Sequence, residues 1–293
     1  SALTRPSSIV PFCCWIMVYT HTAHIAALLS SCVSFTLITW SRRWDGEVGV
    51  LCMFCWTFSL MSSLLILLIE MFMFLKCVRT IFWCNLHTTI SIYAALFCLN
   101  ASIVFPDYFL KGRENDEFYS HSVVAEIFSC VASLGHLGKV WIMLIESKCY
   151  MASGPGLLQV SQTYTASAII FLLANSVSFE DHPAVIWSLA VYCTCFICTF
   201  ISIIHCAFQN KHNEIWVKGF NLFAGVTYLS ACWPVVQVSQ GQIGCTGSCQ
   251  DETDTLRLWP KTRLIVVVVL TALNFLLYLL SVCCFYMLDS RNK

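Results

Sequence analysis

The chain has 293 residues, of which 58% are hydrophobic and only 11% are charged, and its formal net charge is zero. A soluble domain usually carries about 25% charged residues, so this chain has too little charge to cover a water-exposed surface, and lipid is its expected solvent. The balanced charge gives no support for nucleic acid as a partner, and we expect none.

A helix that crosses the hydrocarbon core of a bilayer needs about 20 mostly apolar residues. Runs of that kind, separated by short polar links, use nearly the whole chain and leave no room for a sizeable soluble domain. We therefore predict an all-α integral membrane protein with eight transmembrane helices. The predicted spans are residues 21–40, 49–74, 81–105, 122–145, 157–177, 184–208, 215–238 and 263–288.

The first 20 residues contain an apolar run, Ile9 to Tyr19, that is too short to cross a membrane. It fits either a segment on the membrane surface or an extension of the first helix, and we predict the surface segment. The ASGPG motif from Ala152 to Gly156 is a strong turn signal, and we place the boundary between two halves there. The predicted parts are a lead-in at 1–20, a first four-helix bundle at 21–149, a linker at 150–156, a second bundle at 157–288 and a polar tail at 289–293.

Two of the apolar spans close with an aromatic residue followed by proline, at Phe105-Pro106 and Trp233-Pro234. Proline has no amide donor, and its ring clashes with the preceding turn of a helix. The sequence therefore predicts that Pro106 and Pro234 end their helices.

Small side chains gather in the fourth span. In lipid they allow two helix backbones to approach closely, where packing replaces the hydrophobic drive. We predict the tightest helix contact of the first bundle on this face, and a partner helix or a sterol is the alternative occupant. The residues are Ser129, Ala132, Ser133, Gly135 and Gly138.

Four ionisable residues within the spans are candidates for function, because charge in a membrane is costly. Glu70 lies near the end of the second span, and two interpretations fit it. It is either a structural acid, at the membrane interface or hydrogen-bonded between helices, or a site for an ion or a proton. Glu126 and Lys139 lie 13 positions apart in the fourth span, about 20 Å along the helix, and cannot pair with each other. We expect Lys139 to extend towards the membrane surface, with His136 on roughly the same helix face.

Nineteen cysteines resemble a disulfide scaffold at first, but most of them lie within apolar runs, where cysteine packs as a small hydrophobe. Cys245 and Cys249 are different because they share a polar loop with an intervening glycine. We predict a disulfide between them; a metal site is the alternative, but no second ligand pair accompanies it. No metal or other cofactor is expected elsewhere.

Several stretches resemble the myeloid-associated differentiation marker family, whose members contain two MARVEL domains. The main ones are the run YAALFCLNAS from Tyr93 to Ser102 followed by Pro106, YMA from Tyr150 to Ala152 and PGLL from Pro155 to Leu158. Supporting stretches are Ala168 to Phe171, Ala190 to Tyr192, Trp233-Pro234 and Leu270 to Asn274. Together they are spread over both halves of the chain.

This resemblance implies two four-helix MARVEL-type bundles with both termini in the cytoplasm. The charge pattern alone does not decide the orientation, since the proposed inner segments hold eight Lys or Arg and the outer ones seven. The resemblance further implies a non-catalytic protein of the plasma membrane and trafficking vesicles that organises or sorts proteins in sterol-rich membrane. The expected partners are membrane lipids, with cholesterol as a candidate, and other membrane or cortical proteins.

Two other functions remain open. One is a channel or transporter subunit, although the spans hold few ionisable groups and no clear pair of broken helices. The other is a cell-surface attachment factor that acts through the loops at 107–121 and 239–262. The chain contains no Walker, HExxH, GxSxG or dinucleotide-binding motif, so we expect no enzymatic activity.

Overall fold

The structure is a computed structural model. It describes residues 9–42, 44, 46–76, 81–111, 119–146, 149–174, 183–209, 214–239 and 254–291, with side chains for most of these. Its helices are α1 (Ile9–Ser41), α2 (Gly46–Lys76), α3 (Ile81–Phe109), α4 (Tyr119–Glu146), the short 3-10 helix η1 (Tyr150–Ala152), α5 (Gly154–Ala174), α6 (Pro183–Gln209), α7 (Glu214–Ser239) and α8 (Asp254–Arg291).

Within the described residues, eight helices are long and apolar enough to cross a membrane. Each of them overlaps one of the predicted spans, so the predicted all-α, multi-pass fold is confirmed. The chain divides into two compact units, Ser1–Ala152 and Ser153–Lys293.

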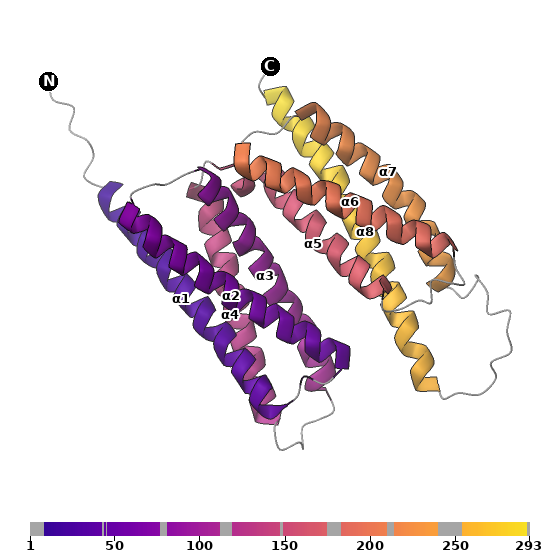
Figure 1. Ribbon diagram of the computed structural model, residues 1–293, viewed down its shortest axis with the longest axis horizontal. Helices are drawn as coiled ribbons and strands as arrows, with labels where there is room; N and C mark the ends of the chain where they lie inside the picture. The colour runs from indigo at the N-terminus through magenta and orange to yellow at the C-terminus, as the bar shows by residue number, and fades with distance from the viewer. Residues whose placement is uncertain are drawn as a thin grey trace. The chain divides into compact units, whose positions relative to one another are not determined.

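The first unit is a four-helix bundle in which the helices follow one another around a ring (Figure 1). Helix α1 packs against α2 and α4, and α3 packs against the same two helices. The contact between α1 and α4 is the most extensive of the bundle. Short links favour this arrangement, because they hold successive helices antiparallel and adjacent.

The second unit repeats the connectivity of the first with four new helices (Figure 1). Helix α5 packs against α6 and α8, and α7 packs against the same two helices. The core of this bundle is built around three tyrosines, Tyr192, Tyr228 and Tyr278, which are all fully buried.

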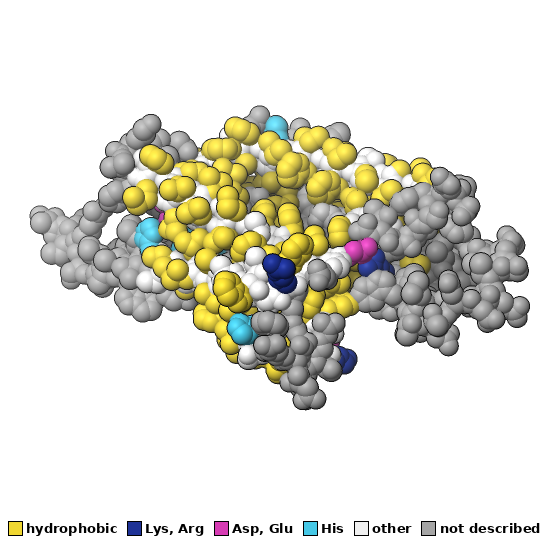
Figure 2. Space-filling view, turned by 60° about the horizontal axis from the view of Figure 1, so that its bottom comes forward, with side chains coloured by type: hydrophobic (Ala, Val, Ile, Leu, Met, Phe, Trp, Pro, Cys, Tyr) yellow, Lys and Arg dark blue, Asp and Glu magenta, His cyan; other side chains and the backbone are white. Residues whose placement is uncertain are grey.

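Large apolar side chains point outward from the helices, the reverse of a soluble bundle. Phe54 and Met61 of α2 and Leu276 and Leu280 of α8 are each more than half exposed. Figure 2 shows hydrophobic side chains over most of the described surface on the face in view. Serine, threonine and other polar side chains are buried between the helices instead. This distribution suits a bundle that lipid surrounds, since polar groups there must find partners inside the protein.

The first helix begins earlier than predicted. Residues 9–20 continue α1 without a break, where we expected a separate segment on the membrane surface. The apolar run supports helix, and Pro11 falls in the first turn, where its missing amide donor would have no helical partner in any case.

The prediction that Pro106 and Pro234 end their helices is wrong. Helix α3 continues to Phe109 and α7 continues to Ser239. A proline near the end of a membrane helix removes one amide donor but leaves the following residues free to complete the turn. The carbonyl of Pro106 itself accepts hydrogen bonds from the amides of Leu110 and Lys111, each at 3.1 Å.

The segment between the two units is shorter than the predicted linker. Helix η1 occupies Tyr150–Ala152, and α5 already begins at Gly154. The carbonyl of Ser153 accepts a hydrogen bond from the Leu157 amide at 3.0 Å, which closes the first turn of α5. Pro155 lies in that turn, a position that proline tolerates well.

Candidate functional site in the first bundle

A cluster of ionisable side chains lies inside the first bundle, near one end. Each of its four helices contributes one residue: His24 from α1, Glu70 from α2, His87 from α3 and Lys139 from α4. His24 and Lys139 are 1% exposed and His87 is 7% exposed. His87 lies six residues from the start of its span and Lys139 six from the end of its span, about 9 Å along the helix in each case.

The members of this cluster form a connected chain of contacts. The Nζ atom of Lys139 contacts both ring nitrogens of His24. The Nε2 atoms of His24 and His87 are 3.3 Å apart, and the two rings stack with their centroids 5.6 Å apart. Glu70 then accepts contacts from two histidines, with Oε1 3.5 Å from His87 Nε2 and Oε2 3.7 Å from Nδ1 of His21.

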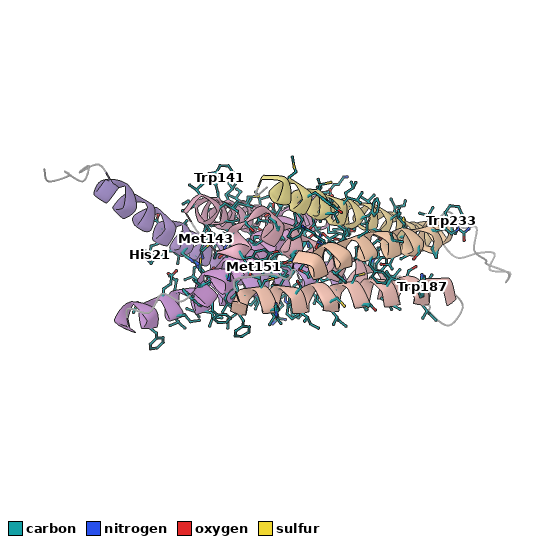
Figure 3. All side chains as sticks on the ribbon, turned by 90° about the horizontal axis from the view of Figure 1, so that it is seen from above. His21, Trp141, Met143, Met151, Trp187 and Trp233 are labelled. Carbon is teal, nitrogen blue, oxygen red and sulfur yellow. The ribbon has the colours of Figure 1, made fainter. Side chains whose placement is uncertain are left out.

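The cluster opens at Glu70 and His21, whose side chains are 23% and 52% exposed. His21 is one helical turn before His24 on α1, so both rings face the same side of that helix. It is labelled in Figure 3. The cluster therefore reaches the surface of the bundle at the partly exposed Glu70 and the exposed His21.

With the neighbouring His21, the cluster contains one carboxylate against three imidazoles and one amine. If all of the basic groups were protonated, their charge would exceed what a single carboxylate can neutralise, and uncompensated charge is expensive away from water. Some of the imidazoles are therefore expected to be neutral. A neutral imidazole donates a hydrogen bond from one nitrogen and accepts, or binds a metal, through the other. The arrangement is suited to holding a cation or moving protons.

A second polar network lies beside the first. Nε2 of His136, one turn before Lys139 on α4, is 2.8 Å from the hydroxyl of Ser59. That hydroxyl is in turn 2.7 Å from the hydroxyl of Ser31 on α1. The network ties three helices together, as interhelical hydrogen bonds do in membrane proteins.

The short helix η1 packs near the same end of the bundle. Its Met151 amide donates a hydrogen bond to Oδ1 of Asn85 at 3.0 Å. Just before it, the buried Cys149 lies 3.6 Å from the hydroxyl of Thr88. Hydrogen bonding, first from Cys84 and then from Thr88, lowers the pKa of the Cys149 thiol below its ordinary value.

The structure revises the prediction for Lys139. This side chain does not extend towards the surface but is buried against His24, because it lies on the face of α4 that packs against α1. Glu126 lies apart from the cluster, and its Oε1 accepts a hydrogen bond from the Cys130 thiol at 3.3 Å. Glu70 does belong to the cluster, and His136 belongs to the neighbouring network.

Sequence reasoning missed His24 and His87. Each is a single histidine in an apolar span, a pattern that indicates no site by itself. The antiparallel order of the helices was the usable signal, because it places the start of the first and third spans beside the end of the second and fourth. His24, Glu70, His87 and Lys139 all lie near those ends.

The small-residue face of α4 lies partly against α1. A Cβ atom at Gly135 would be 3.3 Å from the carbonyl oxygen of Ala23 and 3.3 Å from the Cβ of Ala27. Ser129, Ala132 and Ser133 are buried, and Gly138 is partly buried. The predicted cysteine pair, Cys245 and Cys249, lies outside the described residues.

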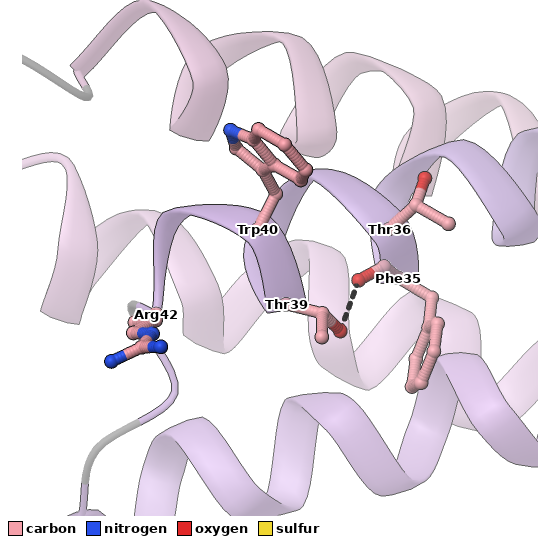
Figure 4. Close-up of a pocket in the computed structure, with 5 residues that line it drawn as sticks. All are labelled: Phe35, Thr36, Thr39, Trp40 and Arg42. Carbon is pink, nitrogen blue, oxygen red and sulfur yellow. Dashed lines mark hydrogen bonds between the residues drawn. The ribbon is translucent and has the colours of Figure 1, made fainter.

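A shallow surface pocket lies near the end of α1 (Figure 4). Thr39 donates a hydrogen bond to the carbonyl of Phe35 there, at 2.7 Å. Trp40 is strongly exposed, and Arg42 follows it in a left-handed backbone conformation with φ of 50°. Tryptophan and arginine together are typical of the boundary between lipid and water.

The interior of the second bundle is polar but built differently. The hydroxyl of Tyr192 is 3.1 Å from that of Thr271, and the hydroxyl of Tyr278 is 3.0 Å from that of Thr199. Asn274 donates to the hydroxyl of Tyr228 at 2.7 Å. At the surface, Trp187 and Trp233 are exposed near the same end of this bundle (Figure 3).

The fold and its buried polar networks define a multi-pass helical membrane protein built from two four-helix bundles. The chain is 32% identical over 278 residues to the myeloid-associated differentiation marker homolog of Xenopus laevis, with 88% of each chain covered. It is 30% identical over 266 residues to the human myeloid-associated differentiation marker, covering 86% of this chain and 82% of the relative. The chain therefore belongs to the myeloid-associated differentiation marker family, which confirms the resemblance seen in the sequence.

The mouse myeloid-associated differentiation marker is similar at 31% identity over 272 residues, with 86% of this chain covered. No family model matches the chain. No solved structure matches it either.

Proposed function

We propose that this protein is a non-catalytic membrane organiser, which sorts or gathers other proteins in sterol-rich regions of the plasma membrane and in trafficking vesicles. The proposal includes MARVEL-type bundles and cytoplasmic termini, both of which rest on family membership. The observation that carries the proposal is the outward-facing apolar surface of both bundles. Such a surface fits lipid chains and the helices of neighbouring membrane proteins.

Helix α8 offers a test of whether this surface meets lipid and partner proteins. Leu273 is exposed, whereas Val267 on the same helix is fully buried. We would place a photo-crosslinking amino acid at each position in turn, in cells fed a clickable cholesterol analogue. Crosslinks to sterol and membrane proteins are expected from position 273 and not from position 267. Equal yields at the two positions would contradict the proposed lateral surface.

Partition between membrane phases tests the role in sterol-rich membrane. The labelled full-length protein is expected to be enriched in the ordered phase of giant plasma-membrane vesicles. Extraction of cholesterol should remove that enrichment. Exclusion from the ordered phase before extraction would refute the sterol-linked part of the proposal while leaving the membrane fold intact.

The buried cluster favours a second candidate function, the movement of ions or protons across the membrane. Glu70 provides its carboxylate, so Glu70→Gln is the informative change. In reconstituted vesicles, a flux that is present in the wild type and lost in a folded Glu70→Gln variant would establish transport and replace the organiser. If the wild-type protein carries no flux, the second candidate fails.

A further inference from the structure

We propose that His24, Glu70 and His87 form a binding site for a transition-metal cation of the zinc class inside the first bundle. Within the described part of the chain, these three side chains bring one ligand atom each to within 4.8 Å of one another. The ligands come from three different helices, so a bound cation would link α1, α2 and α3.

The spacing of the ligand atoms fits a tetrahedral cation. Zinc binds imidazole nitrogen and carboxylate oxygen at about 2.0–2.2 Å, so two ligands of one tetrahedral site are separated by about 3.3–3.6 Å. Nε2 of His24 lies 3.3 Å from Nε2 of His87, which in turn lies 3.5 Å from Oε1 of Glu70. These two distances match this edge length, and the ligand atoms of the third pair, His24 and Glu70, lie within 4.8 Å of each other.

The donor set selects among cations. Two neutral imidazoles and one carboxylate suit zinc and its transition-metal neighbours. Calcium and magnesium prefer sites made of oxygen ligands, and this cluster offers one carboxylate. His21 lies at the exposed edge of the site, with its Nδ1 3.7 Å from Oε2 of Glu70. It can turn to provide a fourth ligand or leave that position to water.

Lys139 is the group that competes with the cation. Its Nζ contacts both nitrogens of His24, and the whole side chain is buried. An ammonium group there would repel a divalent cation and occupy the lone pair of His24. Binding of zinc therefore requires the Lys139 side chain to turn away from His24.

This competition separates a metal site from a purely structural one. If the cluster is purely structural, the Lys139 ammonium is the cation that balances the charge of Glu70. Lys139→Met then leaves the Glu70 carboxylate without that cation and creates no affinity for zinc. If the cluster is a metal site, Lys139→Met removes the competitor at similar side-chain volume, and the affinity for zinc rises. We expect a rise of about tenfold or more, comparable to the effects of groups that surround a metal site.

The experiment measures zinc binding to the full-length protein in lipid nanodiscs. Thiols are alkylated first, because the chain contains 19 cysteines that also bind zinc. One equivalent of zinc per chain is expected, and X-ray absorption at the zinc edge should show nitrogen and oxygen ligands near 2.0–2.1 Å without sulfur near 2.3 Å. His87→Gln and Glu70→Gln should each weaken binding by about tenfold or more.

His205→Gln is the matched control, because His205 is an exposed histidine on α6 of the second unit. It should leave zinc binding unchanged. Circular dichroism and gel filtration confirm that each variant is folded, and Glu70→Gln, at the partly exposed ligand, is the variant least expected to disturb folding. Equal affinity in the wild type and in folded His87→Gln and Glu70→Gln would overturn the proposal. A sulfur-ligated zinc, or a loss of binding in a folded Lys139→Met variant, would do the same.

Discussion

The hydrogen bond between Trp56 and Ser129 is expected to stabilise the first bundle measurably. Nε1 of Trp56 donates to the Ser129 hydroxyl at 2.9 Å, and both side chains are fully buried. The same hydroxyl lies 2.9 Å from that of Ser102. Ser129 therefore joins α2, α3 and α4 at one point.

Ser129→Ala removes the acceptor and leaves the indole N–H buried without it. An unsatisfied buried donor costs about 1–3 kcal/mol, while interhelical hydrogen bonds in membranes average about 0.6 kcal/mol and reach about 1.7. We expect Ser129→Ala to lower the free energy of unfolding by about 1–2 kcal/mol. Trp56→Phe loses both the bond and part of the packing against Phe105, whose ring centroid is 5.4 Å away.

A double-mutant cycle separates the hydrogen bond from the lost packing. The free energies of unfolding of the two single variants and the double variant are measured by titration with SDS in mixed micelles. A coupling energy of about 0.6–1.7 kcal/mol is expected. Ser230→Ala serves as the control, because its exposed hydroxyl donates to the carbonyl of Thr227 in its own helix, and its effect should stay within about 0.5 kcal/mol. A coupling energy near zero, or a Ser129→Ala effect no larger than this control, would refute the reasoning.

Three further changes test other parts of the structure by the same unfolding assay. Gly135→Leu should destabilise by about 1–3 kcal/mol, because even a Cβ there would lie 3.3 Å from a carbonyl oxygen of α1. Gly219→Ala is the control and should not destabilise, because a Cβ at Gly219 meets no described atom within 4 Å. Equal effects of the two changes would contradict the close packing. Tyr278→Phe removes the hydroxyl that meets Thr199 at 3.0 Å and should cost about 0.6 kcal/mol, and no loss would mean that this bond adds nothing to stability. The pKa of Cys149 falls from 9.0 to about 6 on folding, so its contribution to stability is complete above about pH 9 and is lost as the pH falls through about 6. Cys149→Ser should flatten the rise of unfolding free energy across that interval, and an unchanged pH profile would contradict the lowered pKa.

Much of the fold was predictable because membrane solvation leaves few choices. Runs of about 20 apolar residues must form helices in lipid, and short links force neighbours to be antiparallel. The ends of the helices were less predictable. The prediction for Pro106 and Pro234 used the general tendency of proline to stop a helix. In these two spans one missing amide donor near the helix end is tolerated, and the helix continues.

The site was harder to predict, since it depends on how each helix is rotated about its axis. Glu70 was recognisable because a carboxylate in an apolar span is unusual. His24 and His87 gave no such signal. Their role in the site follows from the helix packing, which brings their Nε2 atoms to 3.3 Å from each other. Lys139 was expected to reach water, as long basic side chains near helix ends commonly do. A position facing α1 overrides that tendency.

The two bundles share one connectivity but differ in what they bury. The second bundle holds its helices together with neutral groups, such as Tyr192 with Thr271 and Tyr228 with Asn274. In the described residues of the second unit, neutral hydrogen bonds of this kind and apolar packing join the helices. The first bundle buries His24, His87 and Lys139, whose charged forms are far more expensive there. Among its described residues, the second unit forms the same architecture without a buried histidine or lysine. Folding alone therefore does not account for these groups in the first bundle, and this contrast is the physical reason to look for a ligand among them.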